Sequence, residues 1–435
     1  MQGMSFYPRH AMERITRLLD VFPVVVITGA RQVGKTTLAR LVMEGADGLY
    51  VTLDELAVAD RAARDPRGLV RGLTEGLLVI DEVQLVPDLL REVKLAVDEE
   101  PGRRFLLTGS ANLLKMKHVT ESLAGRSAWL ELGPLLWSEL GGLERPRTVK
   151  AAFDARSAEE YAATVSAQAG PADNSALDAV RRLTVSGSMP GVIPLDGEMR
   201  YAWYEAYRTT FLERDLRQLG SVDNLPDFNR ALALVMHRTG NVLNMSSLGS
   251  DVGVTHKTIK RYLGLLETGY QLRFLPPYFA NVGKRLVRSP KIFACDVGLA
   301  AYIMGVRSWL EAVGSGREGA LLETWVIAEV LALDSLAARP AAPHYWRTSG
   351  GAEIDLVLER GEAVVGIEVK SRATIRYADT AALRSLRTDL DGRFKLGIIA
   401  NLGTEVRVVD DRIVVVPVPM LLGAGSPAIP SVVPL

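Results

Sequence analysis

The chain of 435 residues has few of the residue types that mark several common protein classes. Its one cysteine, Cys295, excludes an intramolecular disulfide and a zinc site built from cysteines. The five histidines are scattered and form no group with metal-ligand spacing. No stretch reaches the roughly 18 apolar residues of a membrane-spanning helix, so we expect no membrane association and a cytoplasmic location.

An excess of one charge is also missing, since 51 Lys and Arg residues balance 51 Asp and Glu residues. A net charge of zero gives no overall field to attract nucleic acid, so any basic surface has to be local. The rest of the composition, 48% hydrophobic and 23% charged, is typical of a globular protein with a large core. The length suggests about three domains, at roughly 150 residues each.

What the chain does contain is a phosphate-binding motif near its start. An apolar run at 24–27 predicts a buried strand, and the sequence GARQVGKT at 29–36 then fits the pattern G-x-x-x-x-G-K-[ST] at every specified position. Backbone N–H groups of such a loop surround a polyphosphate, together with the positive end of the following helix. We expect Lys35 to reach the β- and γ-phosphates and the Thr36 hydroxyl to bind Mg²⁺. The predicted nucleotide-binding residues are Gly29, Ala30, Arg31, Gln32, Val33, Gly34, Lys35, Thr36 and Thr37.

Two acidic residues, Asp81 and Glu82, follow a second apolar run at 77–80. Four apolar residues in a row predict a fully buried strand, so both acids should emerge where open parallel sheets bind ligands. We expect Asp81 to hold Mg²⁺ and Glu82 to polarise the attacking water. Further strands predicted at 49–53, 104–108 and 128–132 alternate with helical patterns, which indicates a parallel α/β sheet with helices on both faces.

Four stretches of the chain, GARQVGKTTL, VIDEVQ, LLTGSAN and SLAGR, occur in this order. They resemble the AAA-like ATPases of bacteria and archaea whose C-terminal half is domain of unknown function 4143, and the resemblance continues through the rest of the chain. It implies an AAA-like P-loop ATPase domain at 1–135 that uses ATP and Mg²⁺. It also implies that Ser110 senses the γ-phosphate and that Arg126 is an arginine finger, which we expect to act across a subunit boundary in a homo-oligomer. The alternative for Arg126 is a solvated or salt-bridged arginine.

The middle of the chain predicts a helical connecting region at 136–225 and a winged helix at 226–290. Helical patterns at 228–236, 246–252 and 255–267, with Gly253 in a turn, are typical of a helix-turn-helix. The third helix carries cations and a hydroxyl on its leading turns, as a recognition helix in the DNA major groove does. The local cations are Lys257, Lys260, Arg261, Arg273, Lys284, Arg285, Arg288 and Lys291, against one acid, Glu267. We expect this surface to bind DNA phosphates, and the alternative is a winged helix that docks another protein.

The C-terminal third, 291–420, predicts a nuclease-like α/β domain. Two alternating stretches at 352–358 and 364–370 form a hairpin in which Glu353 and Asp355 share one face, as do Glu368 and Lys370. An acid followed by acid-x-lysine is the arrangement of restriction-endonuclease-like folds, in which two carboxylates hold Mg²⁺ and the lysine steers water. We predict Asp355 and Glu368 as metal ligands and Asp355, Glu368 and Lys370 as catalytic residues. Upstream, Glu323 matches the helix acid of that fold, and 421–435 is predicted to be a disordered tail.

Two functions follow from these predictions. The first is an ATP-dependent enzyme that acts on DNA, with an Mg²⁺-dependent nuclease site. The second is an ATP-gated switch that binds DNA or protein, in which the nuclease-like domain is catalytically inactive.

Overall fold

A computed structural model of the protein describes residues 7–72, 75–110, 123–170, 172–210, 222, 224–279, 289–348 and 350–423. These residues divide into two units, each described here by itself. The N-terminal unit contains 9–133 and the short stretch 265–271, and the C-terminal unit contains mainly 134–264 and the residues from 272 onward. Within the described ranges, no helix combines the length and the apolar character needed to cross a membrane.

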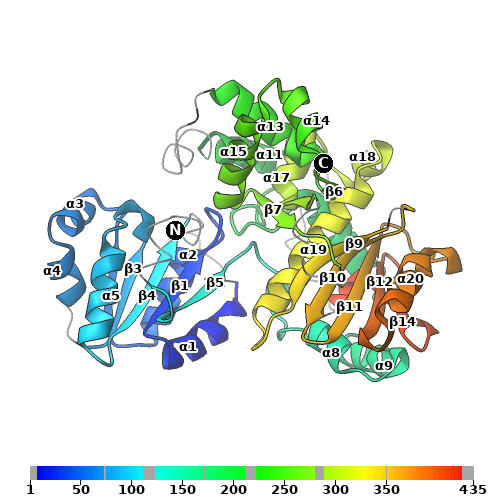
Figure 1. The fold of residues 1–435 in the computed structure, drawn as a ribbon, viewed down its shortest axis with the longest axis horizontal. Coiled ribbons are helices and arrows are strands. Elements are labelled where there is room, and N and C mark those ends of the chain that lie inside the picture. Colours follow the sequence, from blue (N-terminus) through cyan, green and yellow to red (C-terminus); the bar gives the residue numbers. More distant parts are fainter. Residues whose placement is uncertain are drawn as a thin grey trace. The chain divides into compact units, whose positions relative to one another are not determined.

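The N-terminal unit is built on a five-stranded parallel sheet with the order β2-β3-β4-β1-β5 (Figure 1). The central strands β1 and β3 are buried along their whole length, as their apolar runs predict. Because β4 lies between them, the carboxyl ends of β1, β4 and β3 are neighbours at one edge of the sheet. The strands are β1 (Val24–Thr28), β2 (Gly48–Thr52), β3 (Leu77–Asp81), β4 (Arg104–Gly109) and β5 (Ser127–Glu131).

Helices cover both faces of this sheet, which confirms the predicted α/β class. On one face Ala62 of α3, Val70 of α4 and Val93 of α5 share a core with alternate strand residues such as Val24 and Ile80. The helices α1 and α2 contact β1, β3 and β4 with other residues. The elements are α1 (Ala11–Val21), α2 (Lys35–Glu44), α3 (Leu56–Arg64), α4 (Pro66–Arg71), the 3-10 helix η1 (Val83–Leu85) and α5 (Leu89–Glu99).

The C-terminal unit contains a small three-stranded antiparallel sheet of order β6-β8-β7, flanked by three helices. These helices lie where the sequence predicts them, and Gly253 ends the second helix in the left-handed conformation, with φ 82°. Asn244 caps the start of that helix by accepting from the N–H of Ser247. The elements are α13 (Leu225–His237), β6 (Asn241–Val242), α14 (Met245–Val252), α15 (His256–Thr268), β7 (Leu272–Leu275) and β8 (Lys291–Ala294).

A six-stranded mixed sheet of order β13-β14-β12-β11-β10-β9 forms the rest of this unit (Figure 1). The predicted hairpin is β10 and β11, which pair antiparallel up to Arg360 and Ala363. Helix α20 packs Leu383 and Leu386 on one face, against Ile354 among others. The strands are β9 (Ala342–Arg347), β10 (Glu353–Arg360), β11 (Ala363–Lys370), β12 (Phe394–Asn401), β13 (Arg407–Asp410) and β14 (Ile413–Pro417).

Two helices from the predicted connecting region pack on the six-stranded sheet. Helix α8 (Thr148–Asp154) contacts β11 and β12, and α9 (Ala158–Gln168) contacts β13 and β14. The disordered tail predicted at 421–435 begins too early in that prediction, because Leu421 is buried in α21 and its carbonyl accepts from the Thr148 hydroxyl at 2.6 Å. Residues 424–435 lie outside the described residues. The other helices are α7 (Trp137–Leu140), α10 (Asn174–Ser186), α11 (Gly197–Thr210), α17 (Val297–Met304), α18 (Trp309–Gly314), α19 (Glu318–Ser335), α20 (Ala381–Leu390) and α21 (Val418–Leu421).

Candidate functional site

The phosphate-loop motif forms the turn between β1 and α2. Gly29 has φ 147°, and a Cβ there would lie 2.1 Å from the carbonyl oxygen of Leu132. Gly34 has φ 95°, and an added Cβ would meet nothing within 4 Å among the described residues, so its side faces open space. Gln32 adopts a left-handed conformation with φ 63° although it is not glycine. Such strain occurs preferentially at functional sites, and it supports this loop as the binding site.

Lys35 and Thr36 begin α2, directly after the loop. Lys35 is 4% exposed, and its Nζ donates to the carbonyl oxygens of Gly29 at 3.0 Å and Ala30 at 2.7 Å. The ammonium therefore lies against the inner side of the loop. Thr36 turns toward β3, where its hydroxyl donates to Asp81 Oδ2 at 2.9 Å.

The Asp81 carboxylate accepts hydrogen bonds from three hydroxyl groups. Besides Thr36, the donors are Tyr50 on β2, at 2.8 Å, and Thr108 on β4. Burial raises the pKa of Tyr50 to about 12, so this phenol remains a donor at neutral pH. Asp81 itself is 2% exposed. A buried carboxylate beside a threonine hydroxyl provides the hard oxygen ligands that Mg²⁺ prefers, so the residues present fit this ion.

Glu82 follows Asp81 in a strained left-handed conformation, with φ 58° and ψ 45°. Its N–H donates to the Thr108 hydroxyl at 3.1 Å, which holds the turn beside β4. The Gln84 side-chain amide donates both to the Glu82 carboxylate and, at 3.0 Å, to the hydroxyl of Ser110. The structure thus brings the predicted water-activating residue and the predicted sensor to the same edge of the sheet.

Arg126 lies elsewhere in the N-terminal unit. It precedes β5, whose first residue Ser127 pairs with Val24 at the start of β1. Because the phosphate loop follows the opposite end of β1, Arg126 is not brought to the loop of its own chain. Its guanidinium forms a bidentate ion pair with Asp98 of α5, with distances of 2.5 Å and 3.0 Å.

Four residues near the loop and the acids were not singled out from the sequence. Gln84 and Thr108 belong to the motif stretches VIDEVQ and LLTGSAN. Gln84 follows an apolar run and Thr108 ends one, so both could have been predicted as polar residues at the edge of the sheet. Tyr50 lies inside the second predicted strand, where an aromatic residue indicates core packing. Arg9 donates to the carbonyl oxygens of Val33 at 2.9 Å and Gly133 at 2.7 Å, contacts that no local pattern predicts.

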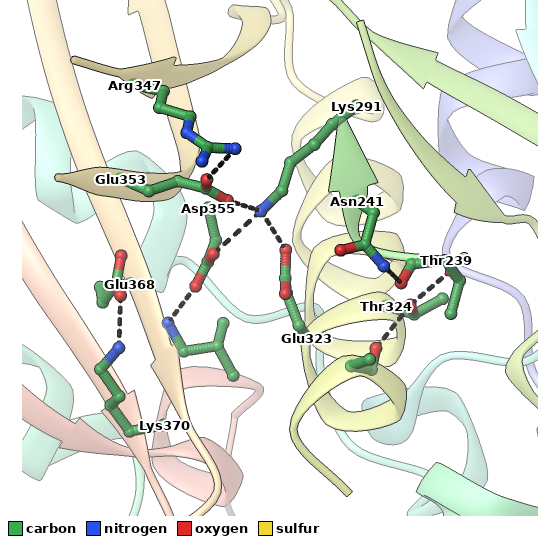
Figure 2. A network of polar contacts seen from close by, with 12 residues as sticks. Thr239, Asn241, Lys291, Glu323, Thr324, Arg347, Glu353, Asp355, Glu368 and Lys370 are labelled. Carbon is green, nitrogen blue, oxygen red and sulfur yellow. Dashed lines mark hydrogen bonds and ion pairs between the residues drawn. The ribbon is translucent and has the colours of Figure 1, made fainter. Parts of the chain in front are cut away.

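A second polar cluster lies in the C-terminal unit, between α19, β8, β10 and β11 (Figure 2). We call its four acids, Glu323, Glu353, Asp355 and Glu368, the carboxylate cluster. Lys291 Nζ lies among three of them, 2.7 Å from Glu323 Oε1, 2.5 Å from Glu353 Oε1 and 3.1 Å from Asp355 Oδ1. The structure brings Glu323, which matched the helix acid of the predicted fold, together with the predicted site residues Asp355, Glu368 and Lys370 (Figure 2).

The predicted metal ligands already have partners. Asp355 Oδ1 accepts from Lys291, and its Oδ2 accepts from the Val369 N–H at 2.9 Å. Glu368 Oε1 accepts from Lys370 Nζ at 2.5 Å, whereas Oε2 has no hydrogen-bond partner in the described part of the chain. Burial and the nearby Asp355 raise the pKa of Glu368 to about 8. Within the described ranges, no three His, Cys, Asp or Glu side chains are placed to share a metal ion.

Lys291 is the main correction to the predicted sites. Its basic sequence neighbours predicted an exposed position on the DNA-binding surface, but Lys291 is 1% exposed and cannot contact DNA phosphates. Burial by itself would lower the pKa of Lys291, but the nearby carboxylates of Glu323, Asp355 and Glu353 have the larger effect, so the pKa of Lys291 is raised. The other cations of α15, Lys257, Lys260 and Arg261, are exposed. Lys284, Arg285 and Arg288 lie outside the described residues.

Comparison with known proteins gives three family matches. Residues 21–141 match the model of an AAA domain, 177–309 match a domain of unknown function (DUF8612), and 318–421 match a domain of unknown function (DUF4143). Among solved structures, the chain is similar to the Walker-type ATPase PABY2304 of Pyrococcus abyssi, at 15% identity with a TM-score of 0.42, over 69% of this chain and 96% of that one. It is also similar to the Aeropyrum pernix ORC1 protein in complex with DNA, at 14% identity with a TM-score of 0.29, over 70% and 94%.

Two curated relatives match almost the whole chain. They are the uncharacterized proteins Rv2008c of Mycobacterium tuberculosis and Mb2031c of Mycobacterium bovis, each 34% identical over 420 residues. The match covers 96% of this chain and 85% of each relative. The protein therefore belongs to the family of these mycobacterial proteins, as an AAA-like ATPase-fold protein with a C-terminal DUF4143 domain.

Proposed function

We propose that the N-terminal unit binds and hydrolyses ATP with Mg²⁺. The observation that carries this proposal is the contact between the two motifs, in which the Thr36 hydroxyl after the phosphate loop donates to Asp81 after β3. A phosphate loop alone indicates only nucleotide binding. The loop together with a strained glutamate beside the second motif supports turnover as well.

In this proposal each residue has a distinct role. Backbone N–H groups of the loop and the start of α2 bind the phosphates, with Lys35 supplying a positive charge. Thr36 and Asp81 would hold Mg²⁺, which when bound neutralises phosphate charge. Glu82 accepts the proton of the attacking water, and Gln84 fixes its carboxylate relative to Ser110.

The test compares two variants with a matched control. Lys35→Ala should lose nucleotide affinity, because the cation and its charge-assisted contacts are removed. Glu82→Gln should keep affinity for a fluorescent ATP analogue but lose phosphate release, since an amide does not accept the water proton. Glu13→Gln, an exposed acid on α1, should match the wild type in both assays. Phosphate release by Glu82→Gln at the wild-type rate would contradict this assignment of Glu82.

A role on DNA is the second part of the proposal. We infer that α13, α14 and α15 with the sheet β6-β8-β7 form a winged helix, and that α15 contacts DNA. The support is the order of these elements and the exposed cations Lys257, Lys260 and Arg261 on α15. The helix pairs exposed positive charge with a buried apolar side that includes Ile259 and Leu263.

Salt dependence tests this second part. Each phosphate contact contributes roughly 0.9 to the slope of log affinity against log salt, so Lys257→Glu with Arg261→Glu should flatten the slope for duplex DNA by about 1.8. Lys150→Glu, an exposed lysine on α8, is the control and should leave the slope unchanged. Unchanged DNA affinity in the double variant would favour a helix that docks another protein.

For the C-terminal domain the contacts of Lys291 favour the catalytically inactive alternative over the nuclease. Asp355, the predicted metal ligand, has both oxygens engaged by Lys291 and the Val369 N–H. We therefore expect no metal-dependent cleavage of single-stranded, duplex or branched DNA, with or without ATP. Cleavage by the wild type that Asp355→Ala abolishes would restore the nuclease assignment.

A further inference from the structure

We propose that Lys291 is the permanent cation of the carboxylate cluster, standing where a nuclease of this fold would hold its metal. The C-terminal domain is then a metal-free ionic connection between the small three-stranded sheet and the six-stranded sheet. This inference goes beyond the proposed ATPase and DNA-binding functions and depends on neither.

The geometry around Lys291 matches the bonding capacity of an ammonium group. A lysine ammonium has three N–H donors and no acceptor. The three acceptors around Lys291 Nζ are single oxygens of Glu323, Glu353 and Asp355, at 2.7, 2.5 and 3.1 Å. Three carboxylates therefore saturate one side chain that is 1% exposed. A divalent ion bound to the same oxygens would have to displace Lys291 and leave a buried ammonium without its partners.

Further cations of the same chain offset most of the remaining negative charge of the cluster. Lys370 pairs with Glu368 at 2.5 Å, and Arg347 lies 3.5 Å from Glu353 Oε2. Three cations thus face the four carboxylates (Figure 2). Every acid of the cluster contacts a cation of the same chain, and Asp355, which a nuclease-like site would use as a metal ligand, has both of its oxygens engaged.

The position of Lys291 explains why this cation connects two sheets. Lys291 is the first residue of β8, while Asp355 and Glu353 are on β10 and Glu323 is on α19. Thr239, just before β6, adds a second contact to α19 through its hydroxyl, 2.8 Å from that of Thr324 (Figure 2). The Thr239 hydroxyl also accepts from the Ala294 N–H of β8 at 3.0 Å.

Backbone hydrogen bonds fix the other strand of the small sheet. The chain leaving β7 pairs with β9, because the Tyr345 N–H donates to Pro276 at 2.9 Å and the Tyr278 N–H donates to Tyr345 at 2.6 Å. The Tyr345 hydroxyl donates to the carbonyl of Ser289, two residues before Lys291, at 2.7 Å. Both β7 and β8 are therefore fixed to the six-stranded sheet, and Lys291 supplies the charged part of that connection.

The first experiment measures Mn²⁺ binding by electron paramagnetic resonance in the full chain without nucleotide. We expect the wild type and Asp355→Asn to bind the same amount of Mn²⁺, because the cluster of the wild type holds no metal. Lys291→Met leaves the carboxylates without their ammonium, so it should gain one Mn²⁺ site that the wild type lacks. Adding Asp355→Asn to Lys291→Met should abolish the new site, which locates it in the cluster.

The second experiment measures thermal unfolding of the same proteins. Lys291→Met should lower Tm by on the order of 10 °C, because one partner of a buried ionic group is removed. Lys150→Met is the matched control, since Lys150 forms an exposed pair with Asp154 at 2.6 Å, and its Tm should fall by about 2 °C or less. Adding Glu323→Gln to Lys291→Met removes one stranded negative charge and should recover part of the loss. If Lys291→Met does not fold, this double variant takes its place in both experiments.

Three results would overturn the proposal. One is Mn²⁺ binding by the wild type that Asp355→Asn abolishes, since a metal would then occupy the cluster despite Lys291. Another is a Lys291→Met protein without an Asp355-dependent Mn²⁺ site. The third is a Tm of Lys291→Met that equals that of Lys150→Met. ATP turnover is read separately and tests the proposed function, so the failure of one inference is distinguishable from that of the other.

Discussion

The ion pair between Arg126 and Asp98 allows a quantitative test of the predicted arginine finger. The two side chains are 34% and 36% exposed, and their closest atoms are 2.5 Å apart. Pairs with this exposure contribute roughly 0.2 to 1 kcal/mol to stability. An arginine finger acting on a neighbouring copy instead raises turnover by roughly 10³ to 10⁵. At about 1.36 kcal/mol per tenfold change, that is about 4 to 7 kcal/mol of the barrier.

The two roles therefore predict different results for Arg126→Ala and Asp98→Ala. If Arg126 is a finger, Arg126→Ala abolishes most ATP turnover, whereas Asp98→Ala keeps turnover because it leaves the guanidinium in place. If Arg126 only stabilises the unit, both variants lower the free energy of unfolding by the same small amount and hardly change turnover. Urea unfolding and phosphate release on the same preparations measure the two quantities.

A mixing experiment separates action between copies from action within one chain. Lys35→Ala lacks a working loop but retains Arg126, and Arg126→Ala has the converse defect. Mixing the two should restore part of the turnover if the site is shared in a homo-oligomer. Equal, small effects of Arg126→Ala and Asp98→Ala, with no recovery at any mixing ratio, would refute the finger.

Three further predictions concern Asp296, Thr108 and the metal. Burial raises the pKa of Asp296 to about 6 from 3.8, so the folded protein favours the protonated carboxyl. Protonated Asp296 therefore contributes about 3 kcal/mol to the free energy of unfolding below about pH 4, and this contribution is lost as the pH rises through 6. Asp296→Asn, which retains an N-cap side chain at α17, should remove this pH dependence of the free energy of unfolding. A difference between the variant and the wild type in urea unfolding that does not change with pH would contradict this prediction. Thr108→Val should cost about 1 to 3 kcal/mol in urea unfolding, because the Glu82 N–H loses its acceptor and Asp81 loses a donor, whereas Thr16→Val, at an exposed position of α1, should cost far less. Chelation of Mg²⁺ should stop phosphate release and its readdition should restore it, and turnover that persists in chelator would argue against Thr36 and Asp81 as metal ligands.

Much of the predicted nucleotide site could be read from the sequence because its polar residues occur in short, contiguous motifs. The loop at 29–36 and the pair Asp81 and Glu82 each follow an apolar run, and burial of that run determines where the polar residues emerge. The convergence of the two motifs was also predictable, since parallel strands place their carboxyl ends at one edge. Arg9 escaped prediction, because its two acceptors are 24 and 124 residues away in the chain.

The C-terminal unit shows the limit of local patterns. The composition around Lys291 is basic, which indicated an exposed surface, but its acceptors on Glu323 and Asp355 are 32 and 64 residues away. The helices α8 and α9 likewise looked like a connection, because the sheet that they cover begins almost 200 residues later in the chain. In both cases long-range packing decided the outcome.

The strand order of the N-terminal sheet has a consequence for the nucleotides that the proposed ATPase should distinguish. Neighbouring strands lie about 4.8 Å apart, so the insertion of β4 separates β1 from β3 by about 10 Å. A ligand held by the loop after β1 has to extend past the end of β4 before it meets Glu82 after β3. Under the proposed ATPase function we therefore expect selection by the number of phosphates: a nucleotide with too few of them would occupy the loop without reaching Glu82.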